Sequence, residues 1–515
     1  MFGKVNCIAS AGIDGYIVQV EADVSNGLPS FDMVGFLASE VREARERVRT
    51  ALRNSDYLLP PSRVTVNLSP ADRRKKGNLF DLPIAIAILI AVGFLPQQYA
   101  ENTIFIGELG LNGQIQPVHG ILSLVSRGKQ EGFSRYIVPV QNANEAAVIQ
   151  GTQVYGLQSL KEVVKFLGNS SDYEQVIVDP EALLREKNEI SVDFSEINGQ
   201  TVMKRAAEVA VAGMHNMLII GPPGSGKSML AKRIPTILPS LTLEESIEIS
   251  KIYSICGMLT EKHPLITARP FRSPHHTVSP TALIGGGRMP KPGEMSLADK
   301  GVLFLDELPE FQNTTLEVMR QPMEDRKVVI SRVYGNDVYP ADSLLLAAMN
   351  PCRCGYYPDR TICHCSQRQI RQYLSRISKP LLDRIDICVE APRIAYEELQ
   401  KRQQNETSKQ IQSRVEHAVS IQRERYKAET ILFNSQLSGK QIAVYCELGK
   451  EETELMRLIF DQMQFSARAH DRILKVARTI ADLGQSERIT TEHLAEAITY
   501  RSLEQKFWGR KEEDQ

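Results

Sequence analysis

The sequence predicts an α/β protein of about three or four domains, in which a parallel-sheet core lies between an α+β amino-terminal domain and a helical carboxy-terminal domain. The chain has 515 residues, of which 42% are hydrophobic and 24% charged, and this composition is typical of a packed globular protein. Residues 193–395 alternate short apolar runs with helical segments, which is the pattern of a parallel sheet. Residues 396–515 are rich in Glu, Lys, Gln, Arg and Leu and have few glycines, which favours helices.

Residues 1–170 mix strand-like and helical segments and are expected to form the α+β domain. Short β-rich runs predict strands at 16–20, 63–68, 103–106 and 136–140. Helices are predicted at 39–54 and 83–92. The second is apolar on all sides, so we expect it to be buried, with Asp81 as its N-cap. The polar segment 171–192 predicts a linker before the core.

Charge and cysteine content limit the partners and the compartment. Lys plus Arg number 61 against 62 for Asp plus Glu, so binding to nucleic acid would need a local basic surface. Segment 42–76 has ten basic and four acidic side chains and is either such a surface or an ordinary solvated face. Eight cysteines, a start without a signal-peptide core, and a longest apolar run (82–95) too short for a membrane span lead us to expect a soluble cytoplasmic protein without a membrane partner.

An apolar run at 217–220 leads directly into GPPGSGKS, which has the spacing of a P-loop. Glycines let successive backbone N–H groups converge on phosphate oxygens, and the helix that follows adds positive potential. We therefore expect Lys227 to reach the terminal phosphates of ATP and Ser228 to bind Mg²⁺. The residues expected to cradle the nucleotide are Gly221, Pro222, Pro223, Gly224, Ser225, Gly226, Lys227 and Ser228.

Two further strand ends carry polar side chains where a parallel sheet places its ligands. GVLFLDE (301–307) ends in two carboxylates: Asp306 would hold Mg²⁺, and Glu307 would polarise the attacking water as general base. The alternative is an acidic strand-to-turn junction without a role in catalysis. A third run, 343–349, ends in Asn350, whose amide could orient a water near the γ-phosphate. In this order the three elements indicate an AAA+ ATPase.

Four longer segments occur around these motifs: RPFRSPHHTVSPTALIGGG (269–287), PGEMSLADKGVLFLDELPEF (292–311), RQPMEDRKVVISR (320–332) and KPLLDRID (379–386). Together they resemble the ComM/YifB family of magnesium-chelatase-like AAA+ proteins, and the resemblance covers nearly the whole chain. It implies an AAA+ P-loop core with a helical lid. It also implies a homohexameric ring with ATP at the subunit interfaces, which drives branch migration of DNA during homologous recombination and natural transformation.

The resemblance also assigns two arginines. It places an arginine finger at Arg384, whose guanidinium would stabilise charge on the γ-phosphoryl group held by a neighbouring subunit. The alternative is that Arg384 pairs with Asp383 or Asp386 at a surface turn. The segment 466–483 resembles the lid helix of the family, and we prefer Arg468 to Arg472 as its nucleotide-sensing arginine because Arg468 lies at the start of that helix.

Two segments are candidates for contact with DNA inside a ring. RKVVISRVYGNDVYP predicts a β-hairpin with its turn at 335–336 and with Arg332 near the tip as a phosphate contact. The glycine-rich segment 285–293 carries Arg288 and Lys291 and is a second candidate channel loop. An exposed arginine without a role in DNA binding is the alternative for the hairpin.

Four cysteines follow the third strand in the pattern C-x-C-x8-C-x-C: Cys352, Cys354, Cys363 and Cys365. Four thiolates within 14 residues can close tetrahedrally on Zn²⁺, so we expect a structural zinc site. His364 could replace one sulfur. Plain buried or redox-exchanging thiols are the alternative, because zinc ribbons usually have wider spacing within each pair.

The segment 104–145 resembles the proteolytic domain of Lon, a fold shared with ribosomal protein S5-like units. Lon-type chemistry needs a serine nucleophile and a lysine base. The matching segments here, KKGNLFDLP (75–83) and PVHGILSL (117–124), lack the serine and the lysine respectively. We therefore expect a binding or scaffolding domain without peptidase activity.

Three classes of function remain open from the sequence. The resemblance favours a DNA motor. A chelatase-type ATPase subunit that drives metal insertion would use the same core, and a regulator that binds ATP without moving DNA would keep the same P-loop. The Lon-like domain favours the motor over the chelatase subunit.

Overall fold

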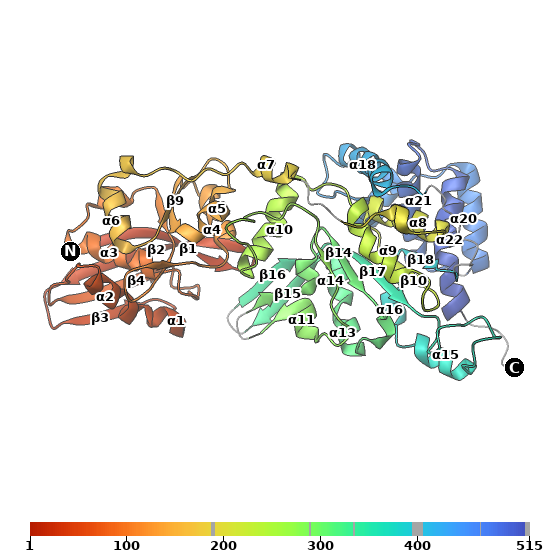
Figure 1. The fold of residues 1–515 in the computed structure, drawn as a ribbon, viewed down its shortest axis with the longest axis horizontal. Helices are drawn as coiled ribbons and strands as arrows, with labels where there is room; N and C mark the ends of the chain where they lie inside the picture. The colour runs from red at the N-terminus through yellow and green to blue at the C-terminus, as the bar shows by residue number, and fades with distance from the viewer. Residues whose placement is uncertain (187–190, 288–289, 333–334, 394–404, 464, 510–515) are drawn as a thin grey trace.

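The computed structural model describes residues 1–515 except 187–190, 288–289, 333–334, 394–404, 464 and 510–515. The molecule is elongated, with the amino-terminal domain at one end, a parallel-sheet core in the middle and the carboxy-terminal helices at the other end (Figure 1). This architecture confirms the α/β fold class expected from the sequence. Among the described helices, none has the length and apolar character needed to cross a membrane.

The amino-terminal domain is built on a mixed sheet with the strand order β3-β4-β2-β1-β5-β8-β9. The long strands β1 and β2 pair antiparallel, whereas β5, β8 and β9 run parallel. The four expected strands overlap β2, β4, β5 and β8, and the expected first helix divides at Glu43 into α1 and α2. The strands are β1 (Phe2–Ala11), β2 (Asp14–Ser25), β3 (Ser30–Val34), β4 (Arg63–Ser69), β5 (Thr103–Phe105), β8 (Arg135–Pro139) and β9 (Gln153–Leu157), with a small ribbon of β6 (Glu108–Leu109) and β7 (Ile115–Gln116). The helices are α1 (Ser39–Arg42), α2 (Ala44–Asn54), α3 (Asp81–Val92), α4 (Ile121–Gln130), α5 (Ala143–Ala147) and α6 (Leu160–Gly168).

Helix α3 is buried along nearly its whole length, as its apolar sequence predicts, but Asp81 is not its N-cap. The N-cap is Phe80, and Asp81 is the first residue of the helix. The buried Asp81 carboxylate accepts hydrogen bonds from Arg47 at 2.7 and 3.0 Å and from the backbone N–H of Leu109 at 3.2 Å. The predicted cap is therefore wrong, because a tertiary ion pair engages this carboxylate.

The central domain is built on a parallel sheet with the order β11-β14-β17-β10-β18. Neighbouring residues of β10 face opposite sides: Leu218 joins one hydrophobic core and Ile219 the other. Burial on both faces explains why these strands read as continuous apolar runs in the sequence. The strands are β10 (Met217–Ile220), β11 (Phe271–Arg272), β14 (Val302–Leu305), β17 (Leu344–Met349) and β18 (Ile387–Glu390).

Different helices cover the two faces of this sheet. One face packs against α8 and the carboxy-terminal helices in a single core, so the helical region and the sheet are joined by continuous apolar packing. These helices are α8 (Thr201–Gly213), α18 (Ser408–Arg425), α19 (Gly439–Tyr445), α20 (Lys450–Met463), α21 (Ala467–Leu483) and α22 (Thr491–Trp508). The other face is covered by α13 (Asn313–Val318), α14 (Arg320–Asp325), α15 (Gln367–Leu374) and a β-hairpin.

The hairpin consists of β15 (Lys327–Arg332) and β16 (Gly335–Pro340) and precedes the Asn350 strand, as expected. Its predicted turn at 335–336 is wrong, because Gly335 pairs with Arg332 and so lies within a strand. Val328 faces Tyr339 in the ladder and both are buried. Burial of this pair fixes the register, since a shift by one residue would turn every side chain to the other face.

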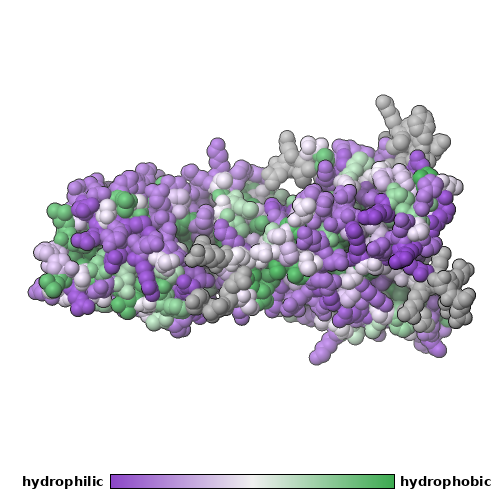
Figure 2. All heavy atoms as spheres, turned by 90° about the horizontal axis from the view of Figure 1, so that it is seen from below, coloured by the Kyte–Doolittle hydropathy of each residue, from purple (hydrophilic) through white to green (hydrophobic). Residues whose placement is uncertain are grey.

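The amino-terminal domain touches the central domain through α4, α5 and α10 (Leu243–Ile255). The backbone N–H of Gly120 donates to the carbonyl of Ser254 at 3.0 Å, and the hydroxyl of Ser254 donates to the buried carboxylate of Glu145. Asn144 Nδ2 donates to the carbonyl of Glu261 at 3.1 Å. Figure 2 shows a mostly hydrophilic face with smaller hydrophobic areas at the amino-terminal end and near the middle of the molecule.

Candidate nucleotide site

The P-loop joins the end of β10 to the start of α9 (Lys227–Arg233). Gly224 and Gly226 have φ angles of 75° and 87°, a left-handed conformation that favours glycine. A Cβ atom on Gly221 would lie 2.4 Å from the carbonyl oxygen of Ala391, so the close packing of the loop on the chain after β18 needs glycine there. The glycines of the motif therefore meet backbone requirements as well as leaving room for a phosphate.

Lys227 is buried and held by oxygen acceptors. Its Nζ donates to the carbonyls of Gly221 and Pro222, both at 2.8 Å, and to Asn350 Oδ1 at 3.2 Å. Burial lowers the pKa of Lys227, and the nearby carboxylates of Asp306 and Glu307 oppose that shift. The structure thus brings together the lysine and the amide that the sequence placed 123 residues apart.

Ser228 and Asp306 meet beside the P-loop. Ser228 Oγ donates to Asp306 Oδ2 at 2.6 Å, and the other carboxylate oxygen accepts from the backbone N–H of Glu307 at 2.9 Å. A hydroxyl and a carboxylate are oxygen ligands of the kind that Mg²⁺ prefers, and Mg²⁺ is usually held by one or two such protein groups together with substrate phosphates. This pair therefore fits the expected Mg²⁺ site.

Glu307 has a left-handed backbone, with φ of 53°. Such a conformation is strained for a residue other than glycine, and strained positions cluster at functional sites. Its side chain is 60% exposed, and His276 Nδ1 lies 3.9 Å from Glu307 Oε2. Sequence reasoning missed His276 as a neighbour of the expected general base, although it lies in one of the four segments that carry the family resemblance.

Arg384 lies at the sheet edge opposite the P-loop. The P-loop follows the carboxyl end of β10, whereas Arg384 lies between α16 (Lys379–Leu382) and the amino end of β18, which runs parallel to β10. Strands of four residues at ~3.3 Å per residue separate the two edges by about 13 Å. Arg384 therefore lies far from the P-loop of its own chain.

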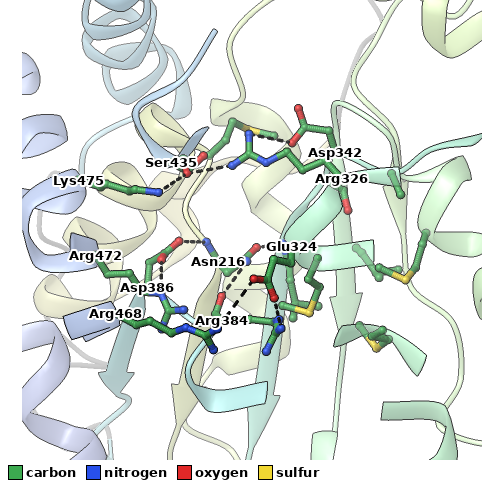
Figure 3. A pocket seen from close by; sticks show the side chains of 18 of the residues that line it. Asn216, Glu324, Arg326, Asp342, Arg384, Asp386, Ser435, Arg468, Arg472 and Lys475 are labelled. Atoms are coloured by element: carbon green, nitrogen blue, oxygen red, sulfur yellow. Dashed lines mark hydrogen bonds and ion pairs between the residues drawn. The ribbon is translucent and has the colours of Figure 1, made fainter. Parts of the chain in front are cut away.

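Arg468 lies at the same edge as Arg384. Both line a cavity of about 260 Å³ (Figure 3). The side chain of Arg468 is 60% exposed, whereas Arg472 is 13% exposed and its Nε lies 3.4 Å from Asp386 Oδ1. The arginine preferred from the sequence is thus the more accessible of the two. Further charged residues lining the cavity, which sequence reasoning did not select, are Glu324, Arg326, Asp342, Asp471 and Lys475.

The four cysteine sulfurs form a compact group, all within 4.8 Å of one another. Cys352 Sγ lies 3.3 Å from Cys354 Sγ and 3.7 Å from Cys363 Sγ, and Cys365 completes the group. Tetrahedral bonds of about 2.3 Å to zinc place sulfurs ~3.8 Å apart, so the group fits Zn²⁺ with little adjustment. His364 is exposed and lies outside the group.

The cysteine loop, residues 352–365, also packs against the P-loop. A Cβ atom on Gly355 would lie 2.4 Å from Pro223 Cδ. Gly355 has a φ of 88°, so both the space and the backbone require glycine there. Any change in the fold of the cysteine loop would therefore reach the phosphate-binding loop.

The structure describes the candidate DNA contacts only in part. Arg332 ends β15, but its side chain lies outside the described residues, as does Arg288. Lys291 is exposed on β13 (Lys291–Pro292), which pairs with β12 (Gly285–Gly286).

Part of the basic segment 42–76 is neutralised. Arg47 pairs with Asp81, Arg45 with Glu46 and Arg63 with Asp32. Lys75 is buried and donates to the carbonyls of Pro70 and Arg73. The exposed arginines Arg42, Arg49 and Arg53 remain available to a partner, so the basic surface is smaller than the charge count suggests.

Three family models match the chain. The model described as magnesium chelatase, subunit ChlI, matches residues 193–399; subunit ChlI of Mg-chelatase matches 20–142; and magnesium chelatase, subunit ChlI C-terminal, matches 405–501. These matches agree with the P-loop, with the acid pair Asp306 and Glu307, and with the arginine edge, the sheet edge that carries Arg384 and Arg468. Together they define the class: the chain is a magnesium-chelatase-like AAA+ protein.

Full-length relatives identify the family within this class. Competence protein ComM of Haemophilus influenzae is 41% identical over 499 residues, which cover 96% of each chain, and YifB of Escherichia coli is 39% identical over 501 residues, 97% of each. The chain belongs to this ComM/YifB family, as its sequence motifs predict. A magnesium-chelatase 67 kDa subunit of Chlorobaculum parvum is 26% identical over 164 residues, 31% of this chain and 23% of its own.

Proposed function

We propose that the protein is a ring-forming ATPase, active as a homohexamer, that uses ATP hydrolysis to drive branch migration of DNA in recombination and natural transformation. The observation that carries the proposal is the position of Arg384 and Arg468 at the sheet edge opposite the P-loop. Arginines placed there serve hydrolysis only if a second copy of the chain presents its P-loop to them. Catalysis at the interface between copies couples ATP turnover to movement within a ring.

At that interface, different residues bind the phosphates, hold Mg²⁺ and activate the attacking water. The P-loop N–H groups and Lys227 bind the phosphates of ATP, and the carbonyl of Gly221 and the amide oxygen of Asn350 hold the Lys227 ammonium group at the loop. Ser228 and Asp306 would hold Mg²⁺, which neutralises charge on the phosphates when bound. Glu307 accepts a proton from the attacking water, and Asn350 orients that water.

The arginines complete the site from the neighbouring copy. The Arg384 guanidinium stabilises charge that develops on the transferred γ-phosphoryl group, with Arg468 beside it. The proposed DNA contacts are Arg332, Arg288 and Lys291, whose cationic side chains suit phosphate oxygens. Contacts to phosphate do not depend on the base sequence of the DNA, and branch migration requires such sequence-independent binding.

The extent of similarity favours a ComM-like competence protein over a chelatase subunit. ComM and YifB match along 96% or more of the chain, whereas the chelatase 67 kDa subunit matches 31% of it. The model that matches residues 20–142 is itself described as a chelatase subunit, so the amino-terminal domain alone does not separate the two classes. The full-length match is the stronger support.

We also propose that the four cysteines bind a structural Zn²⁺. Their sulfur–sulfur distances fit a tetrahedral site, and the loop that they define contacts Pro223 through Gly355. Zinc would supply a fixed cross-link in a segment between β17 and α15, and so would brace one side of the P-loop.

The proposed function is tested with purified full-length protein and a synthetic four-strand DNA junction. We expect the junction to stimulate ATP hydrolysis and to be converted to forked duplexes. Glu307→Gln should lower both activities about 10²-fold or more while ATP binding persists, because the general base is lost and the P-loop is intact. Glu310→Gln, an exposed change three residues away, is the control and should retain both. Junction conversion that survives in Glu307→Gln would contradict the motor mechanism.

A further inference from the structure

Glu324, near the end of α14, contacts two arginines from distant parts of the chain. Its carboxylate accepts a hydrogen bond from Arg384 Nη2, and Arg468 Nη2 lies 4.0 Å from Glu324 Oε1 (Figure 3). Arg384 precedes β18 and Arg468 begins α21, so a single carboxylate joins the central domain to the carboxy-terminal helices at this edge.

The guanidinium of Arg384 is held at both of its terminal nitrogens. Nη1 donates to the carbonyl of Pro380 at 2.7 Å, and Nη2 donates to Glu324. The side chain is only 13% exposed, and its Nε has no hydrogen-bond partner among the described residues. The carbonyl of Pro380 is fixed by the backbone, so the carboxylate of Glu324 sets the remaining orientation of the guanidinium.

The other cations of the cavity have partners of their own. Arg472 pairs with Asp386, Arg326 pairs with Asp342, and Lys475 Nζ donates to the carbonyl of Ser435 at 3.1 Å. These contacts leave Glu324 as the carboxylate that Arg384 and Arg468 share.

Two guanidinium groups repel each other, so their proximity needs an anion between or beside them. Glu324 supplies that charge. The side chains of Glu324 and Arg468 are 56% and 60% exposed, so the cluster reaches solvent and a second chain through them, beside the largely covered Arg384. A triphosphate held by a neighbouring P-loop presents several oxygens, and two adjacent guanidiniums can bind them together.

We propose that Glu324 is a positioning residue that holds Arg384 and Arg468 side by side, so that both meet the same nucleotide of the neighbouring copy. This inference rests on the proposed function, because it needs hydrolysis at an interface between copies. Glu324 itself touches no phosphate, since a carboxylate would repel one. It acts through the two arginines that it orients.

Loss of Glu324 should lower the turnover of ATP more than its binding. The P-loop that binds ATP lies at the opposite edge of the same chain and is unchanged. We expect Glu324→Gln to reduce kcat about tenfold and to leave KM for ATP within about twofold, because the lost interaction stabilises the transition state. Glu324→Ala should have a larger effect, because the amide of glutamine still accepts a hydrogen bond from Arg384. Asp325→Asn, the adjacent exposed carboxylate, is the matched control and should leave kcat unchanged.

A subunit-mixing experiment separates this role from a general loss of structure. Glu324→Ala chains keep an intact P-loop, and Lys227→Ala chains keep an intact arginine edge. Mixing the two should restore ATP hydrolysis well above the sum of the separate activities, because the active P-loop then meets a correctly held pair of arginines. In a chain that already carries Arg468→Ala, Glu324→Ala should lower kcat by a smaller factor than in the wild-type chain, because one of the two partners of Glu324 is already absent.

The outcomes distinguish the inference from the function on which it rests. Wild-type kcat in Glu324→Ala overturns the inference. The inference is also overturned if Lys227→Ala chains restore ATP hydrolysis when mixed with Arg384→Ala chains but not when mixed with Glu324→Ala chains. Failure to restore Arg384→Ala itself would overturn hydrolysis between copies, and with it both proposals.

Discussion

The hydroxyl of Ser228 and the carboxylate of Asp306 are joined by a 2.6 Å hydrogen bond between the start of α9 and the end of β14. This bond places the two proposed oxygen ligands of Mg²⁺ side by side at the carboxyl edge of the sheet. Asp306 is further held by the backbone N–H of Glu307 at 2.9 Å. A cation arriving with ATP would therefore meet ligands whose positions are already fixed, so little ordering is needed to bind it.

Ser228→Ala should raise the Mg²⁺ concentration needed for half-maximal ATP hydrolysis about tenfold, because the hydroxyl of Ser228 is a proposed Mg²⁺ ligand and alanine has no ligand atom. Ser228→Thr is the matched control. It keeps the hydroxyl and should keep a nearly normal Mg²⁺ requirement. Hydrolysis rates measured over a Mg²⁺ titration check the prediction, and equal requirements in the two variants would argue against Ser228 as a ligand.

Arg384→Ala should lower kcat for ATP hydrolysis about 10³-fold, which is within the range known for arginine fingers. Binding of ATP by the same chain should persist, because Arg384 lies about 13 Å from its own P-loop edge. Mixing Arg384→Ala with Lys227→Ala chains should restore hydrolysis at the interfaces where an intact P-loop meets an intact arginine. Arg185→Ala, an exposed arginine on α7 (Pro180–Arg185), is the control. A monomer that hydrolyses ATP at the full rate would contradict the prediction.

The purified protein should contain about one zinc per chain, and Cys352→Ser should lose most of it, because three sulfurs close the site less well than four. Cys256→Ser changes a cysteine outside the group and should keep the metal. Zinc loss should also weaken ATP binding, since Gly355 packs on Pro223 of the P-loop. Metal analysis and thiol titration check this: a chain without zinc whose four thiols react freely would rule out the site.

Motifs with fixed spacing could be predicted from the sequence because neighbouring residues act together. The P-loop, the acid pair and Asn350 each follow an apolar strand, and a parallel sheet brings the carboxyl ends of its strands to one edge. The structure places Asn350 beside Lys227 and Asp306 beside Ser228. The burial of α3 could also be predicted from local sequence, because a helix that is apolar on all sides must be buried.

Pairs that depend on tertiary packing could not be predicted in this way. Asp81 has the residue type and position of an N-cap, but Arg47 from another helix engages its carboxylate. Glu324 lies in a segment that the family resemblance selected, yet nothing in its type indicates contact with Arg384, 60 residues later. The hairpin turn was misplaced because glycine and asparagine favour turns locally, whereas burial of Val328 and Tyr339 sets the register.

Asp299 provides a prediction about pH and stability. Its side chain is fully buried before β14: one oxygen accepts from the backbone N–H of Asp342 at 2.8 Å, and the other has no partner among the described residues. Burial raises the pKa of Asp299 to about 7, and the neighbouring Lys300 opposes this shift. The folded chain therefore holds this proton more tightly than the unfolded chain, in which the pKa of the carboxyl is about 4.

This group's contribution to stability should be full below pH ~4 and should be lost as the pH rises to about 7, at roughly 1.4 kcal/mol for each pH unit. Asp299→Asn removes the ionisation but keeps an oxygen for the N–H of Asp342. The melting temperature of the variant, relative to the wild type, should therefore increase between pH 5 and pH 8. Asp172→Asn, an exposed change, should show no such trend. A difference between Asp299→Asn and the wild type that stays constant over this range would show that Asp299 does not titrate there.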